Sequence, residues 1–247
     1  LYHQIRPIFK IFLRMPHPSE KELLVATLAV KRASLLTKKL SDSIALTQKS
    51  GTQTKEDKSP VTVGDYAAQA IVNHAISLNF PSDGIVGEED SSSLQDDSEE
   101  ATRLSKKISE IVTEVQQQTT KLSTIIGSLT DIKDIFHSID LGNYEGGSKG
   151  RFWALDPIDG TKGFLRGDQF AVCLALIEDG KVVLGVIGCP NLPETIISNL
   201  EHSGVVGGSF SAIKGVGSYY APFFEDPALF SPYLEQERIF LKQTASP

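Results

Sequence analysis

The chain has 247 residues, of which 40% are apolar, so it is long enough to bury the core of one or two domains. Acidic residues outnumber basic ones by 31 to 24, which argues against a protein that binds long nucleic acid through a basic surface. A small, multiply charged anion is still compatible with this balance if metal ions supply positive charge.

The N-terminus carries a short basic segment. Residues 1–14 include Arg6, Lys10 and Arg14 without any acidic residue, a pattern compatible with a mitochondrial presequence. The single methionine of the chain, Met15, stands immediately before the first helix signal. We therefore expect Met15 to be the natural start and residues 1–14 to be an upstream extension.

The apolar segments and the cysteines indicate the compartment. No run approaches the roughly 20 apolar residues of a membrane helix, and the N-terminus lacks the apolar core of a secretory signal. Cys173 and Cys189 both lie in apolar runs that are typical of strands. Buried, reduced thiols fit this placement better than a disulfide framework or a zinc site, so we expect a cytoplasmic protein.

Helical periodicity dominates the first part of the chain. Ser19 with Glu22 forms a capping-box pattern, and leucines follow at helical spacing, which predicts an amphipathic helix to about Leu40. The polar residues 51–58 predict a loop. A second helix that ends before Pro81 is marked by Ala68, Ile71, Val72, Ala75 and Ile76.

The middle of the chain is expected to cover the fold. A short strand at Gly84–Gly87 delivers Glu88 and Glu89 at its end, and the Ser-, Asp- and Glu-rich residues that follow predict a solvated loop. Residues 101–139 mix apolar and polar side chains at helical spacing. They predict one or two surface helices without a chemical role.

Strands dominate the remainder. An apolar strand at Phe152–Leu155 is followed by two more, at Gln169–Ile177 and Lys181–Cys189, and Asp-Gly between these two predicts a hairpin. A meander follows over Ser209–Tyr220. The glycines of residues 204–217 lack the strand and helix context of a phosphate-binding loop and predict turns or bulges.

The segment from Asp156 to Thr161, DPIDGT, concentrates the candidate chemistry. Pro157 fixes its own φ and Gly160 permits a tight turn, so Asp156, Asp159 and the Ile158 carbonyl can converge on one point. Hard oxygen ligands suit Mg²⁺. A helix that begins near Thr161 would direct its amide groups toward a phosphate at the same place.

Each acidic feature also has an ordinary structural explanation. Asp-x-x-Asp-Gly alone is typical of a turn that caps a helix. Glu88 and Glu89 fit a solvated strand end, and Thr62 with Asp65, in the first turn of the second helix, fits a variant capping box. The presence of all three favours a shared metal site. No cysteine or histidine accompanies the motif, which favours direct attack by water over a covalent phosphoenzyme.

With these residues the chain resembles the 3'(2'),5'-bisphosphate nucleotidases of fungal salt-tolerance type, within the lithium-sensitive inositol monophosphatase superfamily. The resemblance runs from Glu20 to about Leu192 and is most specific over GNYEGGSKGRFWALDPIDGTKGF, whereas residues 91–139 match poorly. Inositol monophosphatases continue DPIDGT with Thr-Asn-Phe. The segment here is Lys-Gly-Phe (162–164), as in the nucleotidases.

The resemblance implies the fold class and the domain limits. It implies an α/β fold, an α+β layered sandwich of inositol monophosphatase type, with a mostly antiparallel sheet between helices and a second α/β domain largely missing. We expect a metal-binding phosphatase domain at 15–224 with an insertion at 91–139. Residues 225–247 form an atypical tail where family members continue toward Trp-Asp-x-Ala-Ala-Gly, so we expect a C-terminally truncated chain with an incomplete site.

The resemblance also implies individual roles. Mg²⁺ would be bound by Glu88, Asp156, the Ile158 carbonyl and Asp159, while Asp65 and Thr161 would prepare the attacking water. Gly160 and Thr161 would contact the substrate, and Glu89 would lie behind the metal ligands or add a further contact. For Arg151, Lys162 and Arg166, a substrate clamp and a solvated flanking position stay open as alternatives.

The implied activity is Mg²⁺-dependent removal of the 3'(2')-phosphate from adenosine 3'(2'),5'-bisphosphate and its phosphosulfate relative, within sulfate assimilation and inhibited by lithium. The alternatives are a phosphatase for inositol phosphates and a non-catalytic remnant. The expected partner is the small nucleotide substrate, without nucleic acid, membrane or an obligate protein partner.

Overall fold

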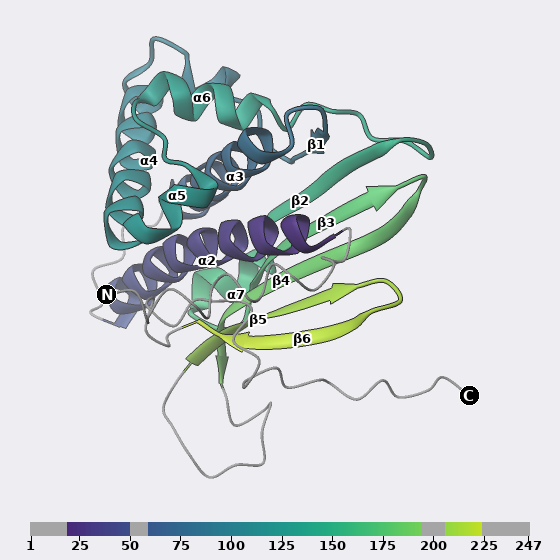
Figure 1. Cartoon of the computed structure of the whole chain (residues 1–247). Coiled ribbons are helices and arrows are strands. Elements are labelled where there is room, and N and C mark those ends of the chain that lie inside the picture. Colours follow the sequence, from purple (N-terminus) through teal and green to yellow (C-terminus); the bar gives the residue numbers. More distant parts are fainter. Residues whose placement is uncertain (1–18, 50–58, 194–205, 224–247) are drawn as a thin grey trace, which may run out of the picture.

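The computed structural model describes residues 19–49, 59–193 and 206–223 (Figure 1). The expectations for the segment 1–14, for Met15, for the loop at 51–58 and for the tail at 225–247 lie outside the described residues. Within the described residues, no helix is long and apolar enough to cross a bilayer.

Two long helices pack side by side and carry most of the core. Helix α2 spans Glu20–Lys49 and helix α3 spans Ser59–Asn79. Helix α2 continues well past the predicted end at Leu40. Ser41, directly after Leu40, is fully buried and donates a hydrogen bond of 2.8 Å to the Phe164 carbonyl, so the helix is packed beyond its predicted end.

Within the residues that the structure describes, the sheet has six strands in sequential order, β1 to β6. Strand β1 pairs with β2 in parallel and all other neighbours are antiparallel, which confirms the predicted mostly antiparallel sheet. Asp179 and Gly180 both have positive φ, 47° and 71°, as the predicted hairpin turn requires. The strands are β1 Gly84–Val86, β2 Arg151–Asp159, β3 Ala171–Glu178, β4 Lys181–Pro193, β5 Val206–Ile213 and β6 Gly217–Pro222.

Helices α2 and α3 cover one face of this sheet, where Trp153, Leu174 and Val186 are buried with the apolar residues of both helices. The register places Asp156, Cys173 and Ile187 side by side on the opposite face. Ile187 is 44% exposed there. The two faces therefore differ sharply: one forms the main core, and the other carries the first acidic residue of the DPIDGT segment.

The segment predicted as a surface cover forms a second core instead. Ile108, Val112 and Ile139 pack with Ala67 and Ile71 of α3 and are almost completely buried. Figure 1 shows these helices grouped along α3, away from most of the sheet. The elements are η1 Ser92–Leu94, α4 Glu99–Gln118, η2 Thr120–Leu122, α5 Ser123–Ile126 and α6 Ile132–Asp140.

The prediction of a solvated loop before this segment was wrong at its end. Ser98 has an extended backbone, and its side chain accepts a hydrogen bond from the Ala101 amide, so it is the N-cap of α4. Glu99 and Glu100 then lie in the first turn, where the helix dipole favours acidic side chains. The acidic composition therefore marks the start of a helix.

Arg32 of α2 joins the two cores. Its side chain is 1% exposed and donates to the Thr119 side chain, the Thr119 carbonyl, the Gly127 carbonyl and the Ser123 hydroxyl at 2.7–3.0 Å. Burial lowers the pKa of Arg32 to about 10, so the guanidinium stays charged at neutral pH. The N–H groups of the Arg32 guanidinium thus hold the α4–α5 junction against α2.

Arg32→Lys should lower the free energy of unfolding by about 2–4 kcal/mol, because an ammonium group cannot reach all of these acceptors and leaves buried carbonyls unsatisfied. Urea denaturation measures this loss. Lys106→Ala is the control: Lys106 is 77% exposed and lies 3.9 Å from Glu110, so its removal should change stability by less than about 0.5 kcal/mol. Equal stability of the two variants would contradict a structural role for Arg32.

Candidate active site

A β-bulge in β2 brings two carboxylates to the same face of the sheet. Asp156 pairs with Cys173 and Asp159 pairs with Ala171, so β2 advances three residues where β3 advances two. Residues three apart point to opposite faces of a regular strand, and one extra residue reverses this. The register therefore places Asp156 and Asp159 on the same face, and burial, then the charge of Asp159, raises the pKa of Asp156.

Two side chains near the bulge contact the backbone of Ile158. Asp156 Oδ1 accepts a hydrogen bond of 3.1 Å from the Ile158 amide. Thr161 Oγ1 lies 3.5 Å from the Ile158 carbonyl oxygen, so the predicted metal-binding carbonyl and the predicted water-binding hydroxyl are neighbours. Gly160 has φ 90° and ψ 44° and forms the N-cap of α7, Thr161–Arg166, at the predicted position.

Glu88 and Glu89 follow β1 as predicted, and because β1 pairs with β2 in parallel, they reach the same end of the sheet. Burial raises the pKa of Glu88, and the charges of Asp156, Glu89 and Asp159 raise it further. The parallel register of β1 and β2 directs the chain at Glu88 toward the bulge. Glu89 is hydrogen-bonded to Tyr66 of α3 and lies deeper.

Asp65 completes the acidic group from helix α3. The prediction that Asp65 lies in the first helical turn was wrong, since α3 begins at Ser59 and Asp65 lies in the second turn. Thr62 is likewise inside the helix, because α3 begins three residues before it. Burial, then the charges of Glu89, Glu88 and Asp156, raise the pKa of Asp65 from 3.8 to about 8.

The carboxylates form a site with uncompensated negative charge. The charged groups that shift the pKa values of Asp65, Glu88 and Asp156 are all acidic, and none of the three forms an ion pair in the part of the chain that the structure describes. Such a donor set fits a hard divalent cation.

The spacing of the donors restricts the kind of ion. Among the described residues, no three Asp, Glu, His or Cys side chains lie close enough to hold one ion by themselves. Mg²⁺ ordinarily retains several waters and binds through one or two carboxylates together with substrate phosphates. The residues therefore fit Mg²⁺ better than a metal that requires a complete protein cage.

The sequence did not predict one neighbour of the site. Cys173 lies directly across from Asp156 on β3, although no cysteine stands near the motif in the sequence. Burial, then the charges of Asp159 and Asp156, raise the pKa of Cys173 to about 12. A protonated thiol is a poor nucleophile, so Cys173 does not provide a covalent route.

The basic residues near the motif behave differently from one another. Arg151 lies at the far end of β2, where it pairs with Glu22, Asp83 and Glu178 at 2.9–3.0 Å, so a clamp role for Arg151 is wrong. Lys162 and Arg166 of α7 are exposed near the bulge. For these two residues, a substrate contact stays a prediction.

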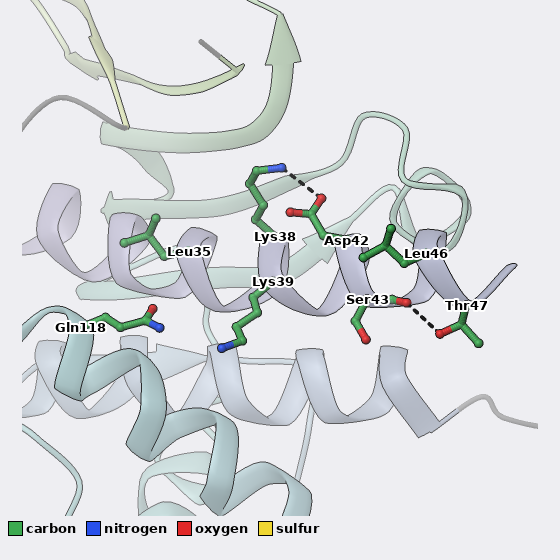
Figure 2. Close-up of a pocket in the computed structure, with 8 residues that line it drawn as sticks. All are labelled: Leu35, Lys38, Lys39, Asp42, Ser43, Leu46, Thr47 and Gln118. Atoms are coloured by element: carbon green, nitrogen blue, oxygen red, sulfur yellow. Dashed lines mark hydrogen bonds and ion pairs between the residues drawn. The ribbon is translucent and has the colours of Figure 1, made fainter. Parts of the chain in front are cut away.

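A hollow of about 520 Å³ lies elsewhere, between α2 and α4. Figure 2 shows Lys38 directed toward Asp42, with which it pairs at 3.1 Å, and Lys39 also pairs with Glu114. The charges of both lysines are thus compensated, and no predicted site residue lines this hollow. Its lining residues are Leu35, Lys38, Lys39, Asp42, Ser43, Leu46, Thr47 and Gln118.

Sequence reasoning also missed Gln69, which contacts the acidic segment. Gln69 lies on α3 one turn after Asp65 and is completely buried. Its Oε1 accepts hydrogen bonds of 3.0 Å from the amides of Glu88 and Glu89. The available signal was a long amide side chain within an otherwise apolar helical stripe, because buried glutamine requires partners.

The sequence matches the Inositol monophosphatase family over residues 92–228. It is 65% identical over 231 residues to 3'(2'),5'-bisphosphate nucleotidase 2 of Candida albicans, which covers 94% of this chain and 63% of that protein. It is 48% identical to 3'(2'),5'-bisphosphate nucleotidase of Emericella nidulans, covering 82% of this chain and 58% of that protein. The chain thus spans about three fifths of the length of these relatives.

Among solved structures, the inositol monophosphatase from Anabaena is similar to this chain, with a TM-score of 0.42 and 18% sequence identity. The similarity covers 83% of this chain and 48% of the Anabaena chain.

Asp65→Asn should stabilise the metal-free protein, and more at pH 8 than at pH 5. The raised pKa of Asp65 means that ionisation opposes folding: the stability present below pH 3.8 is lost as the pH rises toward about 8. With EDTA present, the melting temperature of Asp65→Asn should exceed that of the wild type by several degrees at pH 8. Asp96→Asn, in an exposed loop, is the control, and a pH-independent difference would contradict the electrostatic explanation.

Proposed function

Because the chain belongs to the inositol monophosphatase family, we propose that it provides the acidic site of a Mg²⁺-dependent phosphomonoesterase acting on adenosine 3'(2'),5'-bisphosphate. The observation that carries this proposal is the β2 bulge, which aligns Asp156 and Asp159 beside the coupled carboxylates Asp65 and Glu88. The names of the Candida and Emericella relatives support the choice of substrate.

Glu88, Asp156, Asp159 and the Ile158 carbonyl are the groups that would hold Mg²⁺, since they supply hard oxygen donors at the same end of the sheet. When bound, Mg²⁺ supplies positive charge to the phosphoryl oxygens and lowers the pKa of an attacking water. The protein's contribution is to hold these donors in place, which is the task of the bulge and of the turn at Gly160.

Asp65 and Thr161 would handle the attacking water. The Thr161 hydroxyl orients the water, and the Asp65 carboxylate accepts its proton, because a hydroxyl alone is too weak a base. The water oxygen bonds to phosphorus, the bond from phosphorus to the ribose oxygen breaks, and that oxygen takes a proton from solvent. The products are adenosine 5'-monophosphate and inorganic phosphate.

We extend the proposal to the phosphosulfate relative of the substrate, to a place in sulfate assimilation and to inhibition by lithium at a Mg²⁺ position. Lys162 and Arg166, both exposed on α7, are the candidate contacts for the phosphate groups. A cytoplasmic location is proposed on the basis of the free thiols Cys173 and Cys189.

Phosphate release by the full-length protein tests the proposed substrate. With Mg²⁺ present, adenosine 3',5'-bisphosphate should be turned over with a kcat/KM at least tenfold above that for inositol 1-phosphate, and LiCl should inhibit where equal KCl does not. Preference for inositol 1-phosphate would instead support the other phosphatase class. Absence of turnover for both substrates would support a non-catalytic protein.

A pair of variants separates the two acidic roles. Asp65→Asn in the full-length protein should lower kcat by about 10²–10⁴-fold while the half-saturating Mg²⁺ concentration changes little, because a general base is lost. Glu88→Gln should instead raise the Mg²⁺ requirement, because a cation ligand is lost. Steady-state rates over a Mg²⁺ titration measure both effects. An unchanged kcat in Asp65→Asn would rule out its role as base.

A further inference from the structure

The Gln69 amide is bonded on both sides. Oε1 accepts from the Glu88 and Glu89 amides, and Nε2 donates to the Ile139 carbonyl at 3.0 Å and to the Glu89 carbonyl at 2.6 Å. The side chain is 0% exposed. Such an amide cannot exchange one partner for water, so it fixes the backbone of Glu88 and Glu89 relative to α3 and α6.

The space around this amide is closed. A Cβ atom added to Gly87 would lie 2.7 Å from Gln69 Oε1, and one added to Gly142 would lie 2.7 Å from Nε2. Two glycines on different segments therefore allow the backbone to approach the amide from both sides. The Gly87 amide also donates to the Gly142 carbonyl at 2.8 Å, which joins the two segments directly.

The segment that carries Glu88 and Glu89 is also held by hydrogen bonds to the end of α6. It follows β1 and lies outside the strand, but the Asp140 carboxylate accepts hydrogen bonds from the Ser91 amide at 2.8 Å and from the Ser91 hydroxyl at 2.7 Å. The end of α6 and Gln69 thus both hold this segment. The position of Glu88, close to three like charges, depends on these contacts.

We infer that Gln69 is a positioning residue: by binding the backbone of Glu88 and Glu89, it sets the affinity of the acidic site for a divalent cation. This inference rests on the proposed function, because it assumes that Glu88 is a cation ligand. The hydrogen bonds of Gln69 within the described residues are to main-chain groups of Glu88, Glu89 and Ile139, so its effect is exerted through the main chain. Loss of an outer hydrogen bond of this kind lowers metal affinity by about 10–100-fold.

Asn73 supplies the matched control. It lies on α3 one turn after Gln69, is equally buried, and donates to the Ser138 and Ile139 carbonyls at 2.9 and 3.3 Å. It contacts α6 but not Glu88 or Glu89. Gln69→Met and Asn73→Leu should therefore both lower the melting temperature. Only Gln69→Met should weaken the binding of Mg²⁺ or Mn²⁺, by about 10–100-fold in calorimetric titrations of the purified chain.

Amide hydrogen exchange tests the positioning contact in the wild type, whether or not Gln69→Met folds. The Glu88 and Glu89 amides should be protected, although they lie outside a strand. Exchange at the rate of an exposed loop would overturn the inference, as would unchanged Mg²⁺ affinity in Gln69→Met or an equal loss in Asn73→Leu. A wild-type chain that binds neither cation but protects both amides would overturn the proposed function and with it the assigned effect on cation affinity.

Discussion

The structure depends on holding several carboxylates together at one end of a sheet against their mutual repulsion. Asp65 lies on a helix, Glu88 in the segment after a parallel strand and Asp156 in a bulged strand. In addition to burial, the charges of Glu88 and Asp156 raise the pKa of Asp65, and the charge of Asp156 raises the pKa of Glu88. Like charges at short range oppose folding unless a cation is bound. The apolar cores and the buried hydrogen bonds must therefore supply the stability that this end of the sheet removes.

The two ends of strand β2 differ in whether their charged side chains form ion pairs. Arg151 at its start is surrounded by Glu22, Asp83 and Glu178, and Trp153 donates a further hydrogen bond of 2.9 Å to Asp83. Each charged side chain of that group takes part in an ion pair, with three carboxylates sharing one guanidinium. At the other end, Asp156 and Asp159 form no ion pair with any residue that the structure describes. Ion pairing along one strand thus separates the end that is tied to the fold from the end that suits a ligand.

Local sequence was sufficient for the elements and for part of the site. Pro157 and Gly160 predicted that Asp156 and Asp159 converge, because both residues restrict or release the backbone locally. The errors at Asp65 and Ser98 concern local helix ends, whereas the others were non-local. Ser41 contacts α7 beyond the predicted end of α2, the second core depends on the packing of α4 and α6 against α3, and Cys173 reaches Asp156 only through strand register. Local spacing contains no information on these pairings.

The second core changes how the acidic site must be understood. The segment 101–139 carries no residue of the predicted chemistry, yet the end of α6 contacts Gln69, Ser91 and the Gly87 backbone. Any shift of α6 against α3 is therefore transmitted to Glu88, since close-packed elements do not deform independently. Residues of the Ile108–Ile139 core, remote from the carboxylates, stabilise one position of the acidic segment. The order of the site is thus a property of two packed cores and not of the DPIDGT segment alone.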